Sequence, residues 1–253
     1  SMLDKTNRIL QLTDTLCLGI GLSKEETAIA MEAAQLCKAD LVTKMVIEMT
    51  ALQGTIGKYY ALQRGKSAAI ANAIEEHYQP RNAGDRSPAS KAGLVVGLAD
   101  RLDSLIGLFS AGMAPSGTKD PFGLRRAAIG LVQNLITANI SLDLQKYIFK
   151  ASALLPVNSS PKDCQDCLDF IIGRLEQMLL EEGYAYDAVK AVLAVQGANP
   201  AQAATAIKEL SAWVQRDDWR GTILPTYSRC VRITRNEKEH DNVNSEFFQE
   251  SQE

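Results

Sequence analysis

The sequence predicts an all-α fold, and three observations support this prediction. Apolar residues recur at helical spacing through most of the chain. Residues that favour helix starts precede several of these stretches, and Gly or Pro follows them. The alternation of polar and apolar residues that is typical of β-strands is nearly absent. We expect a helical bundle at residues 1–155, a helical extension of the same unit at 156–235 and an acidic flexible linker at 236–253.

The composition limits the classes of protein to which the chain can belong. Its 253 residues are 46% hydrophobic and carry a formal net charge of −3, and a chain of this length can bury a sizeable core. It has no run of about 18 apolar residues that would predict a membrane span. Its N-terminus lacks the apolar core of a signal peptide. We therefore expect a cytoplasmic protein with no membrane partner, which binds nucleic acid only if its basic residues are clustered.

The five cysteines are scattered along the chain, and their odd number argues against a disulfide framework. Cys164 and Cys167 form a lone C-x-x-C within a helical pattern, with no second pair and no histidine nearby. We interpret them as two free thiols, and zinc or redox chemistry is the alternative.

The N-terminal part begins with helical patterns. Ser23 and Glu26 form a capping box, in which each side chain accepts a hydrogen bond from the backbone amide of the other residue. A long helical pattern follows, and its apolar spacing predicts a buried stripe formed by Val42, Met45, Val46 and Met49. Glycines then interrupt the pattern near Tyr59 and Tyr60. We expect both tyrosines to be half-buried and to pack there, with stacking on nucleic-acid bases as the alternative.

The middle of the chain contains the longest apolar helix. A shorter helix is predicted from Ser67 to Tyr78, because Pro80 disfavours helical geometry in the residue before it. After a polar loop, the long helix starts at Ser90, and one face of it carries Val95, Leu98, Leu102, Leu105, Ile106 and Phe109.

Asp100 and Asp103 lie three residues apart on the long helix, so their side chains project close together. This spacing is compatible with a metal site. It is equally compatible with a solvated edge or with acceptors for neighbouring backbone groups.

The next helix is predicted to begin with Asp120 as N-cap and Pro121 at the first helical position. Lys119, Arg125 and Arg126 surround this start. Free backbone amides together with cations favour a phosphate site, whereas the Asp120 carboxylate favours a well-capped structural helix. The residues leave both interpretations open.

Further helical patterns continue to residue 215. The most regular one runs from Asp163 to Glu182, where Gly183 ends it. Two shorter helices are predicted at Tyr186–Gln196 and Ala201–Gln215. The inward residues of the regular helix are Leu168, Ile171, Ile172, Leu175, Met178 and Leu179.

Longer stretches of the chain resemble the β subunit of bacterial-type glycyl-tRNA synthetase. They occur in order along nearly the whole chain, which is more specific than any single short motif. The main stretches are CKADLVT at 37–43, YQPR at 78–81, ADRLD at 99–103, KDPFGLRRAA at 119–128 and LP at 224–225 with the residues that follow it.

The resemblance implies a glycine–tRNA ligase built from α and β parts, either as separate subunits or as one fused chain. Its α part would activate glycine with ATP and Mg²⁺, and its β part would bind tRNA(Gly). Since the chain is similar only to an interior region of the β subunit, the implied partners are tRNA(Gly), the α subunit or α region and other β-subunit domains. The resemblance implies no cofactor and no catalytic residue within this fragment.

This region of the family is similar to an HD domain, whose members elsewhere are metal-dependent phosphohydrolases. Their metal is held by two histidines and two aspartates around a His-Asp dipeptide. In this chain the dipeptide reads Ala39-Asp40 and no histidine precedes it. By this resemblance Asp40 and Asp100 correspond to the remaining carboxylates, and His77 falls near a later histidine. The resemblance thus implies a degenerate HD site that holds no metal.

Two hypotheses follow for the function. In the first, the chain is a non-catalytic tRNA-binding and scaffold region that contacts phosphates and 2′-hydroxyls. Asp40 and Asp100 then serve the structure, by capping helices or by pairing with Lys38 or Arg101. The alternative is a degenerate HD-type metal-dependent phosphohydrolase, which needs several converging ligands and an open position. A purely architectural role is also open. The candidate tRNA-binding residues are Arg81, Lys119, Arg125 and Arg126.

Overall fold

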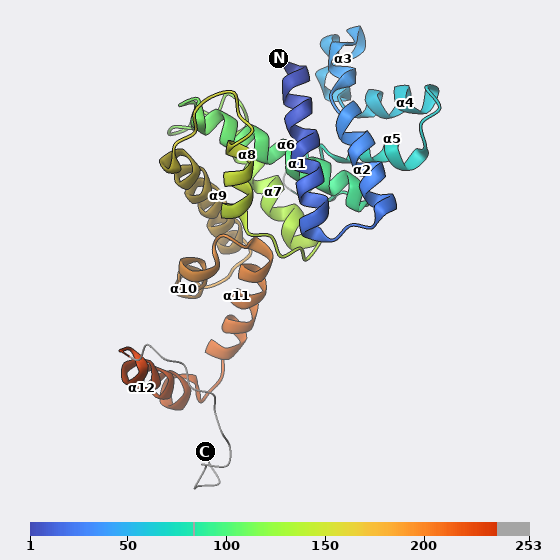
Figure 1. Cartoon of the computed structure of the whole chain (residues 1–253). Helices are drawn as coiled ribbons and strands as arrows, with labels where there is room; N and C mark the ends of the chain where they lie inside the picture. The colour runs from blue at the N-terminus through green and yellow to red at the C-terminus, as the bar shows by residue number, and fades with distance from the viewer. Residues whose placement is uncertain (83, 237–253) are drawn as a thin grey trace. The chain divides into compact units, whose positions relative to one another are not determined.

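The computed structural model describes residues 1–82 and 84–236, and this part of the chain is all-α, which confirms the predicted fold class (Figure 1). The chain divides into two units, Ser1–Lys208 and Glu209–Glu253. The α-helices are α1 Met2–Ile20, α2 Lys24–Leu36, α3 Lys44–Glu48, α4 Thr55–Gln63, α5 Ala68–Glu76, α6 Lys91–Ser110, α7 Leu124–Thr137, α8 Leu144–Ser152, α9 Pro161–Glu181, α10 Tyr186–Gln196, α11 Pro200–Val214 and α12 Leu224–Thr234. Two 3₁₀ turns, η1 Ala39–Val42 and η2 Thr50–Leu52, and a π-helical turn, η3 Trp219–Ile223, complete the described elements.

Helix α6 is the centre of the first unit, and six other helices surround it (Figure 1). It packs against α1, α2, α5, α7, α8 and α9. The six apolar residues predicted for its inner face are all buried, and burial extends to most of its other sides. A helix that is apolar nearly all round has to be enclosed on all sides. This enclosure fixes the positions of Asp100, Arg101 and Asp103, which α6 carries.

Local signals in the sequence set several helix boundaries correctly. Ser23 and Glu26 form the predicted capping box at the start of α2. Ser67 caps α5, and Ser90 caps α6. Helix α9 buries Leu168, Ile171, Leu175 and Leu179, while Ile172 and Met178 pack at the edge of the core. All five cysteines are free thiols, as predicted, and burial raises the pKa of Cys167 to about 12.

The predicted stripe of Val42, Met45, Val46 and Met49 is wrong. Only Val46 is buried, and Val42 is 79% exposed. The cause is that α2 ends at Leu36 and the chain continues as two 3₁₀ turns and the five-residue helix α3. Thr43 is the N-cap of the new helix α3, because its hydroxyl accepts a hydrogen bond from the Val46 amide. Helical spacing across such a break no longer places residues on one face.

The prediction that Tyr59 and Tyr60 are half-buried agrees with their exposure, but neither ring packs against the core as expected. In α4 the two side chains are 58% and 39% exposed. The buried residues of this helix are the small Gly57 and Ala61, which let α4 lie close to α5. The tyrosines are therefore available on the surface of the first unit.

The second unit is described over residues 209–236, and none of these residues is buried. It contains η3 and α12, which contact each other. The predicted linker at 236–253 lies outside the described residues except for Asn236, and the boundary predicted after residue 155 stays a prediction. Within the described residues, none of the helices is long and apolar enough to cross a membrane.

Candidate functional site

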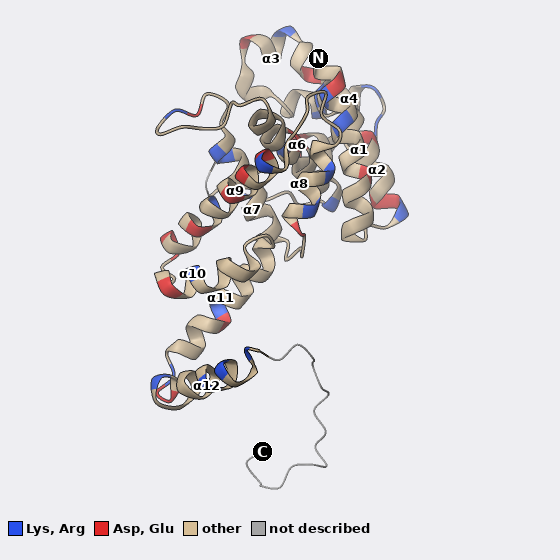
Figure 2. Ribbon diagram, turned by 60° about the vertical axis from the view of Figure 1, so that its left-hand side comes forward, with Lys and Arg blue, Asp and Glu red and all other residues tan. Residues whose placement is uncertain are grey.

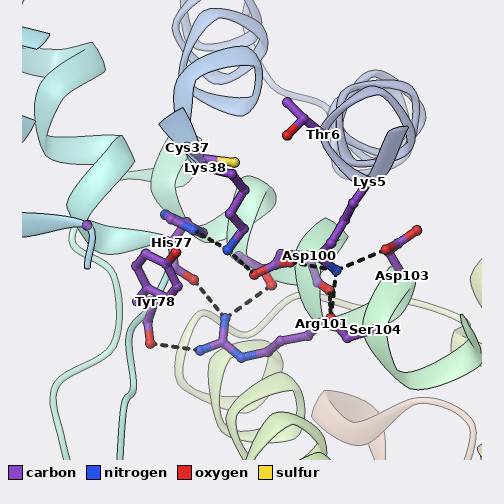
Figure 3. Close-up of polar contacts among 12 residues, drawn as sticks. Lys5, Thr6, Cys37, Lys38, His77, Tyr78, Asp100, Arg101, Asp103 and Ser104 are labelled. Atoms are coloured by element: carbon purple, nitrogen blue, oxygen red, sulfur yellow. Dashed lines mark hydrogen bonds and ion pairs between the residues drawn. The ribbon is translucent and has the colours of Figure 1, made fainter. Parts of the chain in front are cut away.

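A cluster of charged side chains lies inside the first unit, between α1, α6 and the turns after α2 and α5 (Figure 3). We call it the buried ion cluster, and its members are Lys5, Arg8, Lys38, His77, Asp100 and Asp103. Its centre is Lys38, whose side chain is 6% exposed. The ammonium Nζ donates to Asp100 Oδ2 at 2.7 Å and to His77 Nε2 at 2.9 Å. A buried charge is tolerated when it is paired and hydrogen-bonded in this way.

His77 is held in one tautomer by its surroundings. It lies at the C-cap of α5, and its Nδ1 is 2.6 Å from the carbonyl oxygen of Ile74. Since a carbonyl only accepts, Nδ1 carries the proton and donates, which leaves the Nε2 lone pair to accept from Lys38. Burial and then the charge of Lys38 hold the pKa of His77 well below its usual value. The imidazole is therefore neutral.

The charge of Asp100 is stabilised by two lysines. Burial raises the pKa of its carboxyl group, but the ammonium groups of Lys38 and Lys5 outweigh burial and hold that pKa well below its usual range. Lys5 Nζ lies 3.0 Å from Asp100 Oδ1 and 2.9 Å from Asp103 Oδ2. Arg8 completes the pairing, with Nε 2.5 Å from Asp103 Oδ1. The two aspartates thus share Lys5, and their spacing on α6 serves ion pairing with α1.

Arg101 lies beside the cluster and holds the turn that follows α5 in place (Figure 3). Its Nη1 donates to the carbonyl oxygens of His77 and Gly97, at 2.9 and 3.1 Å. Its Nη2 lies 2.9 to 3.1 Å from three further carbonyl oxygens, those of residues 78, 79 and 80. Gly97 allows this close packing, because a Cβ there would lie 2.8 Å from the His77 carbonyl oxygen. Burial lowers the pKa of Arg101 to about 10.

Asp40 does not join His77 and Asp100. Its Oδ2 accepts hydrogen bonds from the amides of Gly54 at 2.6 Å and Gly57 at 3.2 Å, so the carboxylate caps the start of α4. The three positions that the resemblance assigns to a degenerate HD site are therefore not joined in one group of contacts. Among the described residues no group of three or more His, Cys, Asp and Glu side chains is arranged to hold a metal ion. The cation between His77 and Asp100 is the Lys38 ammonium, and this donor set does not fit a divalent metal.

Arg81 is engaged by the fold. Its guanidinium donates to the carbonyl oxygens of Gln53 at 2.6 Å and Ala51 at 3.3 Å. It also lies over the ring of Tyr78, 5.3 Å from the ring centroid. The fold therefore already uses the guanidinium of Arg81, which sets it apart from an exposed cation that is free to bind a phosphate.

The other three cations, which we call the basic loop, lie together at the start of α7: Lys119, Arg125 and Arg126. Lys119 and Arg126 are exposed, while Arg125 is partly buried and donates to the carbonyl oxygen of Gly117. Figure 2 shows positive and negative residues interspersed along the helices of the first unit. A binding role here therefore rests on a few local cations.

The predicted start of this helix is wrong by three residues. Helix α7 begins at Leu124 after Gly123, which has a left-handed backbone with φ of 68°, so Pro121 is not in its first turn. The Asp120 carboxylate still satisfies the helix start, since it accepts from the amides of Leu124 at 2.8 Å and Arg125 at 2.9 Å. These amides are no longer free for a phosphate. Only the side-chain cations of the basic loop are left as candidates for binding an anion.

Sequence reasoning missed Lys5 and Arg8 as members of the buried ion cluster. They are separated from Asp103 by 98 and 95 residues. No local spacing marks such a pair. Lys38 was recognisable only as a possible partner of a nearby carboxylate.

Two kinds of comparison with known proteins agree. A profile of the family described as "Glycyl-tRNA synthetase beta subunit" matches residues 1–194. The glycine–tRNA ligase, chloroplastic/mitochondrial 2, of Arabidopsis thaliana is 39% identical over 236 residues, which is 93% of this chain and 22% of the relative. The glycine–tRNA ligase beta subunit of Moorella thermoacetica is 37% identical over 259 residues, which is 100% of this chain and 37% of the relative.

A third relative is more similar over a shorter stretch. The glycine–tRNA ligase beta subunit of Aromatoleum aromaticum is 47% identical over 172 residues, covering 67% of this chain and 25% of the relative. The chain thus spans between 22% and 37% of the length of these curated relatives.

Proposed function

The chain belongs to the family of glycyl-tRNA synthetase β subunits, and from this premise we propose that it is a non-catalytic scaffold that helps to hold tRNA(Gly). In this proposal glycine activation with ATP and Mg²⁺ takes place in the α subunit or α region of the synthetase. The other partners of the chain are the remaining domains of the β subunit.

The observation that carries the proposal is the position of Lys38. Its ammonium lies between His77 and Asp100, two of the groups that an HD-type hydrolase would need for its metal. An open coordination position and an activated water have no place there. The cluster supports a structural role, because its charges are paired with one another and are buried or partly buried.

The basic loop is the part that we assign to tRNA. Lys119 and Arg126 are exposed cations on a surface loop and on the first turn of α7. Side chains of this kind contact phosphates and 2′-hydroxyls, because the deep major groove of an A-form duplex hides the base edges. Each phosphate contact adds to affinity and makes binding sensitive to salt.

The test compares two double variants of the complete synthetase that each remove two positive charges. Arg125→Ala/Arg126→Ala removes two cations of the basic loop. Lys24→Ala/Lys162→Ala is the matched control, since both lysines are exposed in the first turns of other helices.

We expect the first variant to raise KM for tRNA(Gly) with little change in kcat. We expect its salt slope of binding to fall by about 0.7–0.9 for each lost phosphate contact. The control should match the unaltered synthetase. Equal tRNA affinity and salt slope in both double variants would remove the basic loop from the proposal.

A further inference from the structure

A pocket of about 490 Å³ opens on the first unit beside α4, and none of the six residues of the buried ion cluster is among its lining residues. The end of α2, the turn η1 and the helices α4 and α5 each contribute to its wall. This volume lies within the range of small-molecule sites in proteins, about 300–1,000 Å³. Its apolar lining includes Leu36, Ala39, Ala61 and Ile74.

Tyr60 forms an aromatic part of this lining, and it is 39% exposed. The core does not use its ring, contrary to the packing that its sequence context predicts. Its neighbour Tyr59 is more exposed and does not line the pocket. A partly exposed ring beside an apolar wall is a suitable surface for a flat apolar group, and nucleic-acid bases stack on such rings.

Asp40 also lines the pocket, and only one of its two carboxylate oxygens is satisfied. Oδ2 accepts from two backbone amides, whereas Oδ1 is buried and has no hydrogen-bond partner among the described residues. Asp40 itself is 2% exposed. An unsatisfied buried acceptor is unfavourable, and an N–H or O–H group of a ligand would relieve this cost. The pocket therefore favours a ligand whose largely apolar group also carries one hydrogen-bond donor for Asp40.

Two cations lie in the lining at the C-terminal end of α4. Lys66 is paired with Glu32 at 2.6 Å. Arg64 is exposed and forms no hydrogen bond or ion pair through its side chain with another described residue. A guanidinium at the edge of an apolar pocket is suited to phosphate, which it binds through two parallel hydrogen bonds.

We propose that this pocket binds a nucleotide, with the base against Tyr60 and the apolar wall and the phosphate beside Arg64. A base amine or a ribose hydroxyl donates to Asp40. The same chemistry is present in a free nucleotide and in a single nucleotide of an RNA. This site lies apart from the basic loop and goes beyond the proposed function.

The first experiment measures binding of AMP, GMP, CMP and UMP to the complete chain by calorimetry. We expect at least one of them to bind saturably. Removal of one stacked aromatic contact in Tyr60→Ala should weaken this binding about 5- to 150-fold. Tyr59→Ala is the matched control, because it removes an adjacent exposed tyrosine outside the pocket, and it should bind as the unaltered chain does.

Two further variants keep the test valid if Tyr60→Ala does not fold. Ala39→Trp places a large side chain in the lining from an exposed position and should block binding. Arg64→Ala should weaken nucleoside monophosphates and leave the corresponding nucleosides unaffected. Absence of saturable binding for all four nucleotides would overturn the proposal. So would equal binding in Tyr60→Ala, Ala39→Trp and the control.

A competition experiment in the complete synthetase identifies the source of the nucleotide. If tRNA(Gly) displaces the bound monophosphate and Tyr60→Ala weakens tRNA binding, the pocket takes a nucleotide of the RNA. If tRNA does not displace it, the pocket takes a free nucleotide. Since the monophosphate titration does not involve Arg125 or Arg126, its result can contradict the proposed pocket without affecting the role proposed for the basic loop, and the reverse also holds.

Discussion

The buried ion cluster and the basic loop use the same kinds of side chain in opposite ways. In the cluster, Lys38 has lost nearly all contact with water and is held by a carboxylate and an imidazole. In the basic loop, Lys119 and Arg126 remain in water. Because Lys38 is buried, leaving either it or Asp100 without a partner would be costly, whereas exposure leaves the loop cations free to bind another molecule.

Charged residues in this family therefore have two different roles: some stabilise the interior of the protein, and others remain on its surface. A motif such as ADRLD contains three charged residues, all of which serve the interior of this protein. The cations in the stretch at 119–128 make fewer contacts within the fold, since Lys119 and Arg126 are exposed. The predictions below test this division, beginning with the substitution expected to have the largest effect.

Lys38→Met should cause the largest loss of stability. It leaves the Asp100 carboxylate without its strongest partner in a buried site, and breaking a buried pair in this way costs about 3–5 kcal/mol. Denaturant unfolding measures the loss. Lys44→Met, at an exposed position of α3, is the control and should change stability by no more than about 0.5 kcal/mol.

The double variant Lys38→Met/Asp100→Leu sharpens this prediction. It removes both charges, so part of the lost free energy of unfolding should return. If the double variant were destabilised by the sum of the two single effects, Lys38 and Asp100 would not be energetically coupled, and the cluster would lose its central interaction.

Arg101→Lys should have the next largest effect. A lysine keeps the charge but cannot reach five carbonyl oxygens with its single ammonium group. We expect a loss of about 2–3 kcal/mol, because several buried carbonyl groups lose their partners. Arg126→Lys is the matched control in α7 and should leave the unfolding midpoint unchanged. Equal midpoints for the two variants would contradict the role of Arg101 in fastening the turn after α5.

The pH dependence of stability should separate two members of the cluster. The pKa of His77 is well below about 6.5, its value in an unfolded chain. As the pH falls below 6.5 the unfolded chain gains a proton that the folded chain does not, so stability decreases by about 1.4 kcal/mol per pH unit. His77→Gln keeps a donor for Ile74 and an acceptor for Lys38, and it should lack this decrease.

Asp100 should act in a lower pH range. Its folded pKa is well below about 3.8, so its contribution is fully present above this pH and is lost as the pH falls below it. Asp100→Asn should flatten the stability curve only there. Identical curves for the parent and both variants between pH 7 and pH 3 would show that neither group is linked to folding.

Local patterns predicted most helices and several caps, although not the start of α7, because a Ser-x-x-Glu box or a run such as that of α9 acts within a few residues. They failed between Ala39 and Leu52, where one continuous helix was predicted but the chain forms two 3₁₀ turns and the short helix α3. The buried ion cluster was not predictable as a group, since Lys5, Lys38 and Asp100 come from distant parts of the chain. Their convergence depends on how α1 and α2 pack around α6.

The exposed tyrosines illustrate the same limit for the candidate pocket. From the sequence alone, an aromatic side chain near glycines is predicted to belong to the core. The close packing of α4 against α5 shows that the small residues Gly57 and Ala61 form this interface instead of the tyrosines. The pocket wall formed by Tyr60 follows from that packing.

The smallest effects on stability are expected in the basic loop, where single substitutions sharpen the comparison. Arg126→Ala should leave the unfolding midpoint unchanged and lower the salt slope of tRNA binding by about 0.7–0.9, because its exposed side chain caps nothing in the fold. Arg125→Ala should lower the same slope and also loosen the loop, since Arg125 donates to the Gly117 carbonyl. Arg125→Lys should restore the slope, because it restores the charge, but not the contact with Gly117. If Arg126→Ala destabilised the chain as strongly as Lys38→Met, exposure would not distinguish binding charges from structural ones here, and the assignment of the basic loop to tRNA would lose its physical basis.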